Sequence, residues 1–175
     1  CLLVGALSSQ TWASGFAYDD LTPAGAANAN AVVAGAGDLS AALYNPSGLA
    51  WQEGVQVMLG SHSRTRNVNA DVSGYSHEGE GGLSDISMFA MSWQPKGESW
   101  GVAGSIVTPY SSKTDWNEAF PGQLGQTYLD MQRYALDVFW RGSNTLGVSL
   151  GLDAYDSIVR LNQGAASFSG TGWSK

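Results

Sequence analysis

Charged residues are scarce in this chain of 175 residues: only 13% are Asp, Glu, Lys or Arg, and 8 basic residues stand against 15 acidic ones. The net charge of -7 argues against a nucleic-acid partner, which requires clustered Lys and Arg. The sequence also lacks a run of about 18 apolar residues, which a membrane-spanning helix would need. With Cys1 as the single cysteine, an internal disulfide is impossible.

Glycine and tryptophan are abundant instead, at 23 and 7 residues, and hydrophobic residues make up 43% of the chain. Disordered segments are rich in charge and poor in aromatic residues, so this composition predicts a folded protein. A transmembrane β-barrel combines apolar side chains that face lipid with polar side chains that face the lumen. The composition therefore favours a barrel, and the length allows one domain.

The first residues resemble the end of a secretory signal peptide. Residues 1–7 are apolar and a small-residue cleavage site follows them, so we expect 1–13 to be a signal-peptide remnant. A lipidated Cys1 and an ordinary N-terminal strand are the alternatives. After the remnant we expect a plug over 14–51 and the first strands of a truncated β-barrel wall over 52–175.

The predicted plug contains a tract, residues 30–44, that is apolar but has almost no large side chains. Such a tract can pass through an enclosed space without filling it. Asp38 can cap a short helix that runs to Tyr44. Pro46 disfavours helical geometry at Asn45, so the helix should end there. A simple turn before the first strand is the alternative for the sequence Asn-Pro-Ser-Gly.

Five runs alternate between apolar and polar side chains, with the period of two that marks a strand whose faces have different surroundings. The clearest alternation is at 146–154, where Leu, Val and Ala at even positions alternate with Gly, Ser and Asp. In the second run, apolar side chains occupy both faces. We expect the even-numbered side chains to face lipid and the odd-numbered ones to face the lumen. The predicted strands cover 55–65, 85–94, 99–108, 128–141 and 145–160.

The connections between these runs alternate in length, as they do in outer-membrane barrels with short periplasmic turns and long outer loops. The long connections are at 66–84 and 109–127. Trp93 and Trp100 flank the first short turn and Trp140 precedes the second, as expected for an aromatic girdle at one rim. A soluble β-sandwich also alternates, but it gives no reason for tryptophan beside each short turn.

The number of strands is too small for a complete barrel. The smallest bacterial barrels need about eight strands, and an open sheet edge in lipid would leave backbone groups unpaired. The polar residues at 170–175 supply no closing strand. The sequence therefore predicts a fragment of a larger barrel.

Three blocks of sequence resemble the FadL family of outer-membrane transporters of long-chain fatty acids and other hydrophobic compounds. The first covers 14–49, and in it Ser47 follows Asn-Pro where the family usually has alanine. The blocks at 100–110 and 146–153 resemble the third strand and a later strand of the family. The resemblance implies an all-β, antiparallel transmembrane barrel of fourteen strands, of which this chain holds about five. An N-terminal hatch with short helices precedes them.

The resemblance also implies a function, the passive uptake of long-chain fatty acids or aromatic hydrocarbons through an outer-membrane channel gated by the hatch. Its partners would be hydrophobic small molecules, outer-membrane lipid and lipopolysaccharide, and the protein would be exported by its signal peptide. A structural or adhesive surface β-barrel without transport activity is the alternative. The implied hatch motif is Tyr44, Asn45, Pro46, Ser47 and Gly48.

Four residues are candidates for contact with the cargo. Leu43, Tyr44 and Leu49 on the plug would line an apolar groove that draws in a hydrophobic molecule. Arg133, on the odd-numbered face of its strand, could pair with a fatty-acid carboxylate. An ion pair of Arg133 with an aspartate of the wall, Asp137 or Asp153, is the alternative.

Enzymatic chemistry is not expected. The sequence Gly147-Val-Ser-Leu-Gly151 matches a serine-hydrolase pattern, but it lies inside an alternating strand, and both histidines, His62 and His77, precede it. The histidines do not have the spacing of a metal-ligand pair. We therefore predict no catalytic residue, no cofactor and no metal site.

Overall fold

The computed structural model describes residues 18, 20–29, 31, 37–65, 68–72, 75–81, 83–116, 125–163 and 166–174. The predicted signal-peptide remnant at 1–13 lies outside the described residues. The helices in the described part of the chain are short, and none of them is long and apolar enough to cross a membrane.

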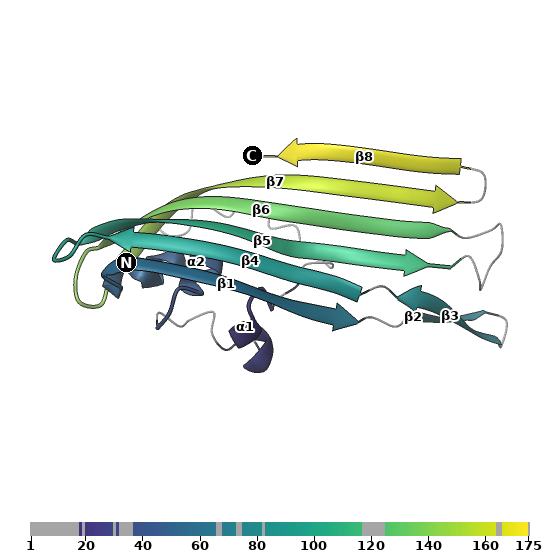
Figure 1. Cartoon of the computed structure of the whole chain (residues 1–175), viewed down its shortest axis with the longest axis horizontal. Helices are drawn as coiled ribbons and strands as arrows, with labels where there is room; N and C mark the ends of the chain where they lie inside the picture. Colours follow the sequence, from purple (N-terminus) through teal and green to yellow (C-terminus); the bar gives the residue numbers. More distant parts are fainter. Residues whose placement is uncertain are drawn as a thin grey trace, which may run out of the picture.

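An antiparallel sheet forms most of the described chain (Figure 1). Its strands are ordered β1-β4-β5-β6-β7-β8, and β2 pairs with β3, which in turn pairs with the end of β5. In the described ranges β1 and β8 lie at opposite edges, so the sheet is an open section of a barrel wall, as predicted. The strands are β1 (Gly54–Thr65), β2 (Val68–Val72), β3 (Tyr75–Gly81), β4 (Leu83–Gln94), β5 (Trp100–Asp115), β6 (Gln126–Arg141), β7 (Gly147–Gln163) and β8 (Ala166–Ser174).

The alternation predicted for β6 and β7 is confirmed. On β6, Leu136 and Val138 are exposed on the outward face, while Asp137 between them is buried on the inward face. On β7, Leu150 and Leu152 are 80% and 77% exposed. Because side chains two residues apart share a face, these strands present a continuous apolar surface outward, of the kind that meets lipid.

On β1 and β4 the odd-numbered side chains, rather than the even-numbered ones, face outward. Val55 on β1 and Phe89 and Met91 on β4 are exposed on the outward face, whereas Ile86 and Met88 are buried on the inward face. The expectation that even-numbered side chains face lipid is therefore wrong for β1 and β4, although it holds for β6 and β7. One residue more or less in a connection exchanges the inward and outward faces of the strand that follows. The alternation within that strand does not show which of its faces is inward.

The tryptophans at the short turns form one rim, as predicted. The rings of Trp93 and Trp100 meet edge to face, with centroids 5.8 Å apart. Trp100 is paired with Trp140 across β5 and β6. The indole nitrogen of Trp140 also donates a hydrogen bond to the Ser99 hydroxyl at 3.0 Å. Aromatic side chains therefore gather where β4, β5 and β6 reach the short turns.

The strands are longer and more numerous than predicted. The connection expected at 66–84 contains the β2–β3 hairpin, and β5 continues to Asp115, into the connection expected at 109–127. Residues 170–174, which we expected to supply no strand, belong to β8. The period-two signal is short or weak in these stretches, because it covers only five residues in β2, and β3, the end of β5 and β8 are mostly polar or glycine.

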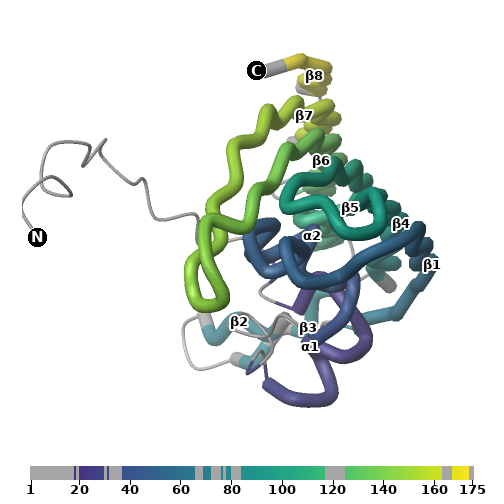
Figure 2. Tube along the Cα trace, turned by 90° about the vertical axis from the view of Figure 1, so that its left-hand side faces the viewer, coloured from purple at the N-terminus to yellow at the C-terminus, as the bar shows by residue number. Residues whose placement is uncertain are grey.

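The N-terminal segment, residues 18–51 as far as they are described, lies on one side of the sheet (Figure 2). It contains α1 (Pro23–Ala27), α2 (Ala41–Tyr44) and the 3-10 helix η1 (Pro46–Trp51). Thr22 caps α1 by accepting a hydrogen bond from the Gly25 amide at 2.8 Å, and Pro23 fits the first helical position.

Helix α2 ends at Tyr44, as predicted from the proline. Asn45 is extended, with φ -151° and ψ 81°, because the ring of Pro46 excludes the helical conformation before it. Pro46 then starts η1. At the other end of α2 the N-cap is Ser40 rather than Asp38, and the Asp38 carboxylate accepts a hydrogen bond from the Ser40 amide at 2.9 Å.

Candidate functional site

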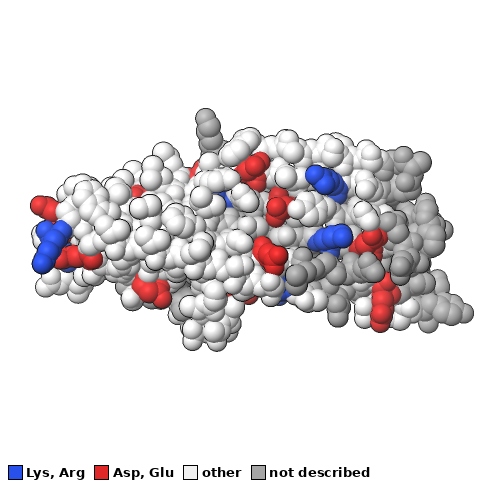
Figure 3. Space-filling view, viewed as in Figure 1, with Lys and Arg blue, Asp and Glu red and all other residues white. Residues whose placement is uncertain are grey.

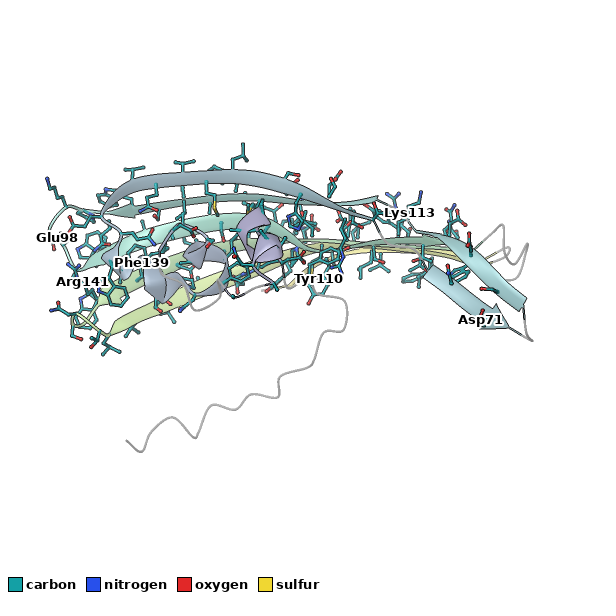
Figure 4. The ribbon with its side chains drawn as sticks, turned by 90° about the horizontal axis from the view of Figure 1, so that it is seen from below. Asp71, Glu98, Tyr110, Lys113, Phe139 and Arg141 are labelled. Carbon is teal, nitrogen blue, oxygen red and sulfur yellow. The ribbon has the colours of Figure 1, made fainter. Side chains whose placement is uncertain are left out.

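The candidate site is the interface between the N-terminal segment and the inward face of the sheet. Small and medium-sized apolar side chains fill its centre. On the segment these are Leu39, Ala41, Ala42, Leu49 and Ala50, and on the sheet Ala90, Ala103 and Phe139. Phe139 lies at the end of the sheet that α2 and η1 cover (Figure 4). Apart from Phe139 and the two leucines, these side chains are alanines, so the segment can approach the wall closely while each alanine buries little apolar area.

A second apolar cluster lies further along the same interface. It consists of Leu21 and Leu43 from the segment and Met88 and Val107 from the sheet, with Tyr44 and Met58 packed against it. Leu43 is 3% exposed and Leu49 is not exposed at all. Leu43 and Leu49, two of the four predicted cargo contacts, therefore pack against the wall in this conformation. A cargo could reach them only if the segment moved.

Arg133 links the wall to the segment. Its Nε donates to Asp153 Oδ1 at 3.0 Å, which realises the ion pair that we considered as the alternative. Its Nη1 donates to the backbone carbonyl of Leu43 at 3.1 Å. The carbonyl is at the C-terminal end of α2, where the backbone carries partial negative charge that a guanidinium stabilises. Arg133 therefore holds α2 against β6 through a charge-assisted hydrogen bond.

Two further contacts hold η1. The side-chain amide of Gln94 on β4 donates to the carbonyl of Ala50 at 3.3 Å and to that of Glu98 at 2.8 Å. At the start of β7, a Cβ added to Gly147 would lie 2.7 Å from the Ser47 carbonyl oxygen and 2.9 Å from the Trp51 ring. A larger residue at Gly147 would therefore push η1 off the wall.

Several buried polar atoms on the inward face have no hydrogen-bond partner among the described residues. They come from three neighbouring strands. The inward face therefore carries polar groups as well as apolar side chains, as expected for a face that lines the lumen of a barrel. The atoms are Ser92 Oγ, Gln94 Oε1, Ser105 Oγ and Asp137 Oδ2.

The beginning of the segment contacts the other half of the sheet through a charged cluster. Asp20 lies 3.6 Å from His62 and 3.8 Å from Arg64 on β1. The Arg64 guanidinium also lies over the Tyr18 ring, 5.4 Å from its centroid. The segment is thus held at several places along the wall, by Gln94 near the short turns, by Arg133 on β6 and by this cluster on β1.

Tyr18 also covers a break in the sheet. The described pairs of β4 and β5 stop at Met88 and Val107, where β5 has an irregularity in register. Beyond it, the amide of Tyr18 donates to the Pro109 carbonyl at 2.9 Å, and its hydroxyl donates to the Ser111 carbonyl. The Ser84 hydroxyl on β4 also donates to the Ser111 carbonyl, at 3.0 Å. The N-terminal segment and a side chain of β4 therefore both contact β5 beyond the irregularity.

The predicted motif Tyr44-Asn45-Pro46-Ser47-Gly48 forms the junction of α2 and η1. The Tyr44 hydroxyl accepts a hydrogen bond from the Thr22 amide at 3.2 Å, which ties α2 to the start of α1. The Ser47 hydroxyl donates to Asn45 Oδ1 at 2.6 Å, and the Gly48 amide donates to the Asn45 carbonyl at 2.9 Å. The motif therefore holds a tight change of direction in the segment.

Sequence reasoning missed four residues of this interface: Asp20, His62, Gln94 and Gly147. Gln94 and Gly147 lie beside the short turns. Their places in the alternation of β4 and β7 could have put them on the inward face, once the inward face of each strand was known. The pairing of Asp20 with His62 joins residues far apart in the chain, and no spacing in the sequence marks it. The serine of the hydrolase-like pattern, Ser149, lies in the strand β7, as predicted.

Comparison with known families identifies the chain. Residues 4–172 match the family described as outer membrane protein transport protein (OMPP1/FadL/TodX). A comparison with curated proteins gave no match. The match spans nearly the whole chain and agrees with the open antiparallel wall and its tryptophan rim. The chain therefore belongs to the FadL family of outer-membrane β-barrels, which transport hydrophobic compounds.

Proposed function

We propose that this protein lets long-chain fatty acids or aromatic hydrocarbons enter the cell passively, and that residues 14–51 act as a hatch while 52–175 belong to the barrel wall. The observation that carries the proposal is the position of the N-terminal segment, which packs on the inward face of the sheet and is held there by Gln94, by Arg133 and by the Asp20 cluster. In a closed barrel, that face surrounds the lumen. A segment held there by two apolar clusters and a few polar contacts blocks passage until it moves.

Movement of the hatch would create the binding surface for the cargo. Leu43 and Leu49, now buried, would leave apolar side chains of the wall uncovered, and Tyr44 would add an aromatic ring. A hydrophobic molecule that covers this surface gains about 25 cal/mol for each Å² of apolar area removed from water. The cargo could therefore replace the contacts that the hatch gives up.

Arg133 would connect cargo binding to hatch release. Its guanidinium has five N–H donors, and a carboxylate can accept two of them in parallel. A fatty-acid carboxylate that approached Arg133 would compete with the Leu43 carbonyl for Nη1. The stronger charged acceptor would then free the end of α2. An uncharged aromatic hydrocarbon would lack this interaction, so acids and hydrocarbons should depend differently on Arg133.

Uptake of radiolabelled oleate by cells that produce the full-length protein tests the proposal. We expect Asn45→Ala and Pro46→Ala to lower the uptake rate several-fold while the barrel still folds, because they disturb the junction of α2 and η1. Asn69→Ala on the exposed hairpin strand β2 and Pro95→Ala in a short turn are matched controls and should leave uptake unchanged.

Deletion of residues 14–51 separates the possible outcomes. With the hatch removed, we expect altered oleate uptake together with an increased passage of small polar solutes through an unplugged lumen. Unchanged oleate uptake and unchanged polar leakage would contradict the hatch. Uptake by the wild-type protein no higher than in cells without it would instead favour the structural or adhesive surface role.

We also infer export by a signal peptide that ends near Ala13, since an outer-membrane protein must cross the inner membrane. Amino-terminal sequencing of the mature protein from outer-membrane fractions tests this inference. A start at Ser14 is expected, whereas a retained or lipid-modified Cys1 would contradict it.

A further inference from the structure

A row of side chains crosses the outward face of the sheet near its outer end. Lys113 on β5 is paired with Tyr128 on β6, Tyr128 with Arg160 on β7, and Arg160 with Ser169 on β8. Directly paired residues of antiparallel strands place their side chains on the same face. The row therefore puts two cations, one on each side of a tyrosine, on a single surface.

This surface is the one that faces away from the N-terminal segment. Tyr128 has the same parity on β6 as the exposed Leu136 and Val138, so it lies on the outward face. The irregularity of β5 between Val107 and Tyr110 brings Lys113 to that face as well. The Arg160 guanidinium lies over the Tyr128 ring, 5.7 Å from its centroid.

The row lies above the apolar band. Tyr128 is twelve residues from Trp140 of the periplasmic rim along β6, a path of about 40 Å at 3.3 Å per residue. With a strand tilt of about 40°, the path rises roughly 30 Å, somewhat more than the apolar band of about 25 Å. Tyr134, which stacks on Trp173 at 5.9 Å, lies between the two levels. The row is therefore at the level of the lipid head groups.

The distribution of charge supports this position. Figure 3 shows the outward face with charged residues at its left end, a band beside them that is nearly free of charge, and Lys, Arg, Asp and Glu again over the right half. Figure 4 shows Lys113 well away from Glu98 and Arg141, which mark the end with the short turns. Lys113 and Arg160 are both exposed, and the ion pairs in the described ranges involve other cations, namely His62, Arg64 and Arg133.

We propose that Lys113, Tyr128 and Arg160 bind a phosphate group on the saccharide head group of lipopolysaccharide in the outer leaflet. A phosphate oxygen can accept hydrogen bonds from the ammonium and the guanidinium at once, and the tyrosine ring keeps Arg160 extended toward it. Asp130 and Asp156 lie on the same face but nearer the apolar band, so they confine the anion to the Lys113–Arg160 row. The inference depends on the membrane location of the family and not on the proposed transport.

Binding of lipid A to the purified full-length protein in detergent tests this inference. Two probes are used, bisphosphorylated lipid A and the same lipid after enzymatic removal of both phosphates, with dissociation constants measured by native mass spectrometry. We expect the wild type to prefer the phosphorylated probe. The double variant Lys113→Gln and Arg160→Gln should bind it on the order of tenfold more weakly, because each cation near a charged lipid surface contributes to binding.

The matched control is the double variant Lys96→Gln and Arg141→Gln, which removes two cations at the other end of the sheet and should bind like the wild type. Electrophoresis of unheated samples checks that each variant folds, because a folded barrel migrates differently from the heat-denatured chain. Equal affinity of wild type and the Lys113/Arg160 variant for the phosphorylated probe would overturn the site. Equal affinity of the wild type for the two probes would overturn the role of phosphate.

Discussion

Arg133 on β6 donates a hydrogen bond to the backbone carbonyl of Leu43 at 3.1 Å, so one side chain of the wall holds the end of a helix in the N-terminal segment. The same guanidinium pairs with Asp153 on β7. The ion pair with Asp153 orients the Arg133 side chain, and the hydrogen bond from Arg133 then holds the end of α2. This arrangement makes the attachment of α2 depend on a group that an anionic cargo can also bind.

Replacement of Arg133 by alanine should loosen α2 and η1. The loss of a charge-assisted hydrogen bond in a partly exposed position corresponds to about 1–2 kcal/mol. Amide hydrogen exchange over residues 41–51 should therefore become roughly 5–30 times faster, because local opening becomes easier. Arg160→Ala, on the outward face, is the control and should leave exchange in this range unchanged. Unchanged exchange in Arg133→Ala would mean that the apolar clusters alone hold the helix.

Gly147→Ala should displace η1 from the start of β7. The added methyl group would lie 2.7 Å from the Ser47 carbonyl and 2.9 Å from the Trp51 ring, so the 3-10 helix must shift. Crowding of this kind typically costs about 1–3 kcal/mol. Hydrogen exchange over 46–51 should increase.

Gly104→Ala is the matched control for Gly147→Ala, because the added group would meet its nearest neighbour, the Ala135 carbonyl, at 3.8 Å, an ordinary contact. If both alanine variants exchange like the wild type, η1 does not depend on close approach to β7.

Asp20→Asn should free the beginning of the N-terminal segment. The substitution removes the charge that faces His62 and Arg64 and so weakens the anchor beside Tyr18. These ion pairs are only partly exposed, and their separations of 3.6 and 3.8 Å are long, so we expect them to contribute about 1 kcal/mol and exchange over 20–29 to rise about two- to fivefold. Asp71→Asn on the distant hairpin should have no effect there. A rise of the same size in both variants would point to a general effect of charge.

The outward apolar face should tolerate arginine only near its rim. Leu150 lies within the apolar band and is 80% exposed, so Leu150→Arg should destabilise the folded barrel by about 2–4 kcal/mol in a bilayer. Leu146, beside the short turn and 56% exposed, is closer to the interface, so Leu146→Arg should cost about 0–1 kcal/mol. Urea unfolding in lipid vesicles measures both values, and equal costs would place both residues at the same depth.

The strands that face lipid could be predicted from the sequence because there the two faces differ sharply. On β6, Leu136 and Val138 alternate with Asp137 and its neighbours, and only a strand puts them on opposite sides. The end of α2 could be predicted for a local reason as well, since Pro46 restricts the residue before it. In both cases the structure is decided by interactions between residues that are close together in the sequence.

Features that depend on distant parts of the chain could not be predicted. Which face of β4 is inward depends on the hairpin before it. The alternation in that hairpin covers only the five residues of β2 and is absent from the polar strand β3, so the pattern indicated a loop there. The sequence offered Asp137 and Asp153 equally as partners of Arg133, and the structure selects Asp153. The bond from Arg133 to the Leu43 carbonyl involves a backbone atom, which the sequence cannot single out as an acceptor.

The most direct test of the central claim is oleate uptake with the hatch tied to the wall. Gln94 and Ala50 face each other across the interface, where the Gln94 amide reaches the Ala50 carbonyl at 3.3 Å. Cysteines are placed at these two positions, with Cys1→Ser, and the molecules in which oxidation during export has joined them by a disulfide are isolated. We predict that the oxidised full-length protein takes up labelled oleate several-fold more slowly than either single-cysteine variant, and that a reductant restores the rate. Uptake by the verified disulfide form at the same rate as the reduced form would show that the segment need not move, and would contradict the account.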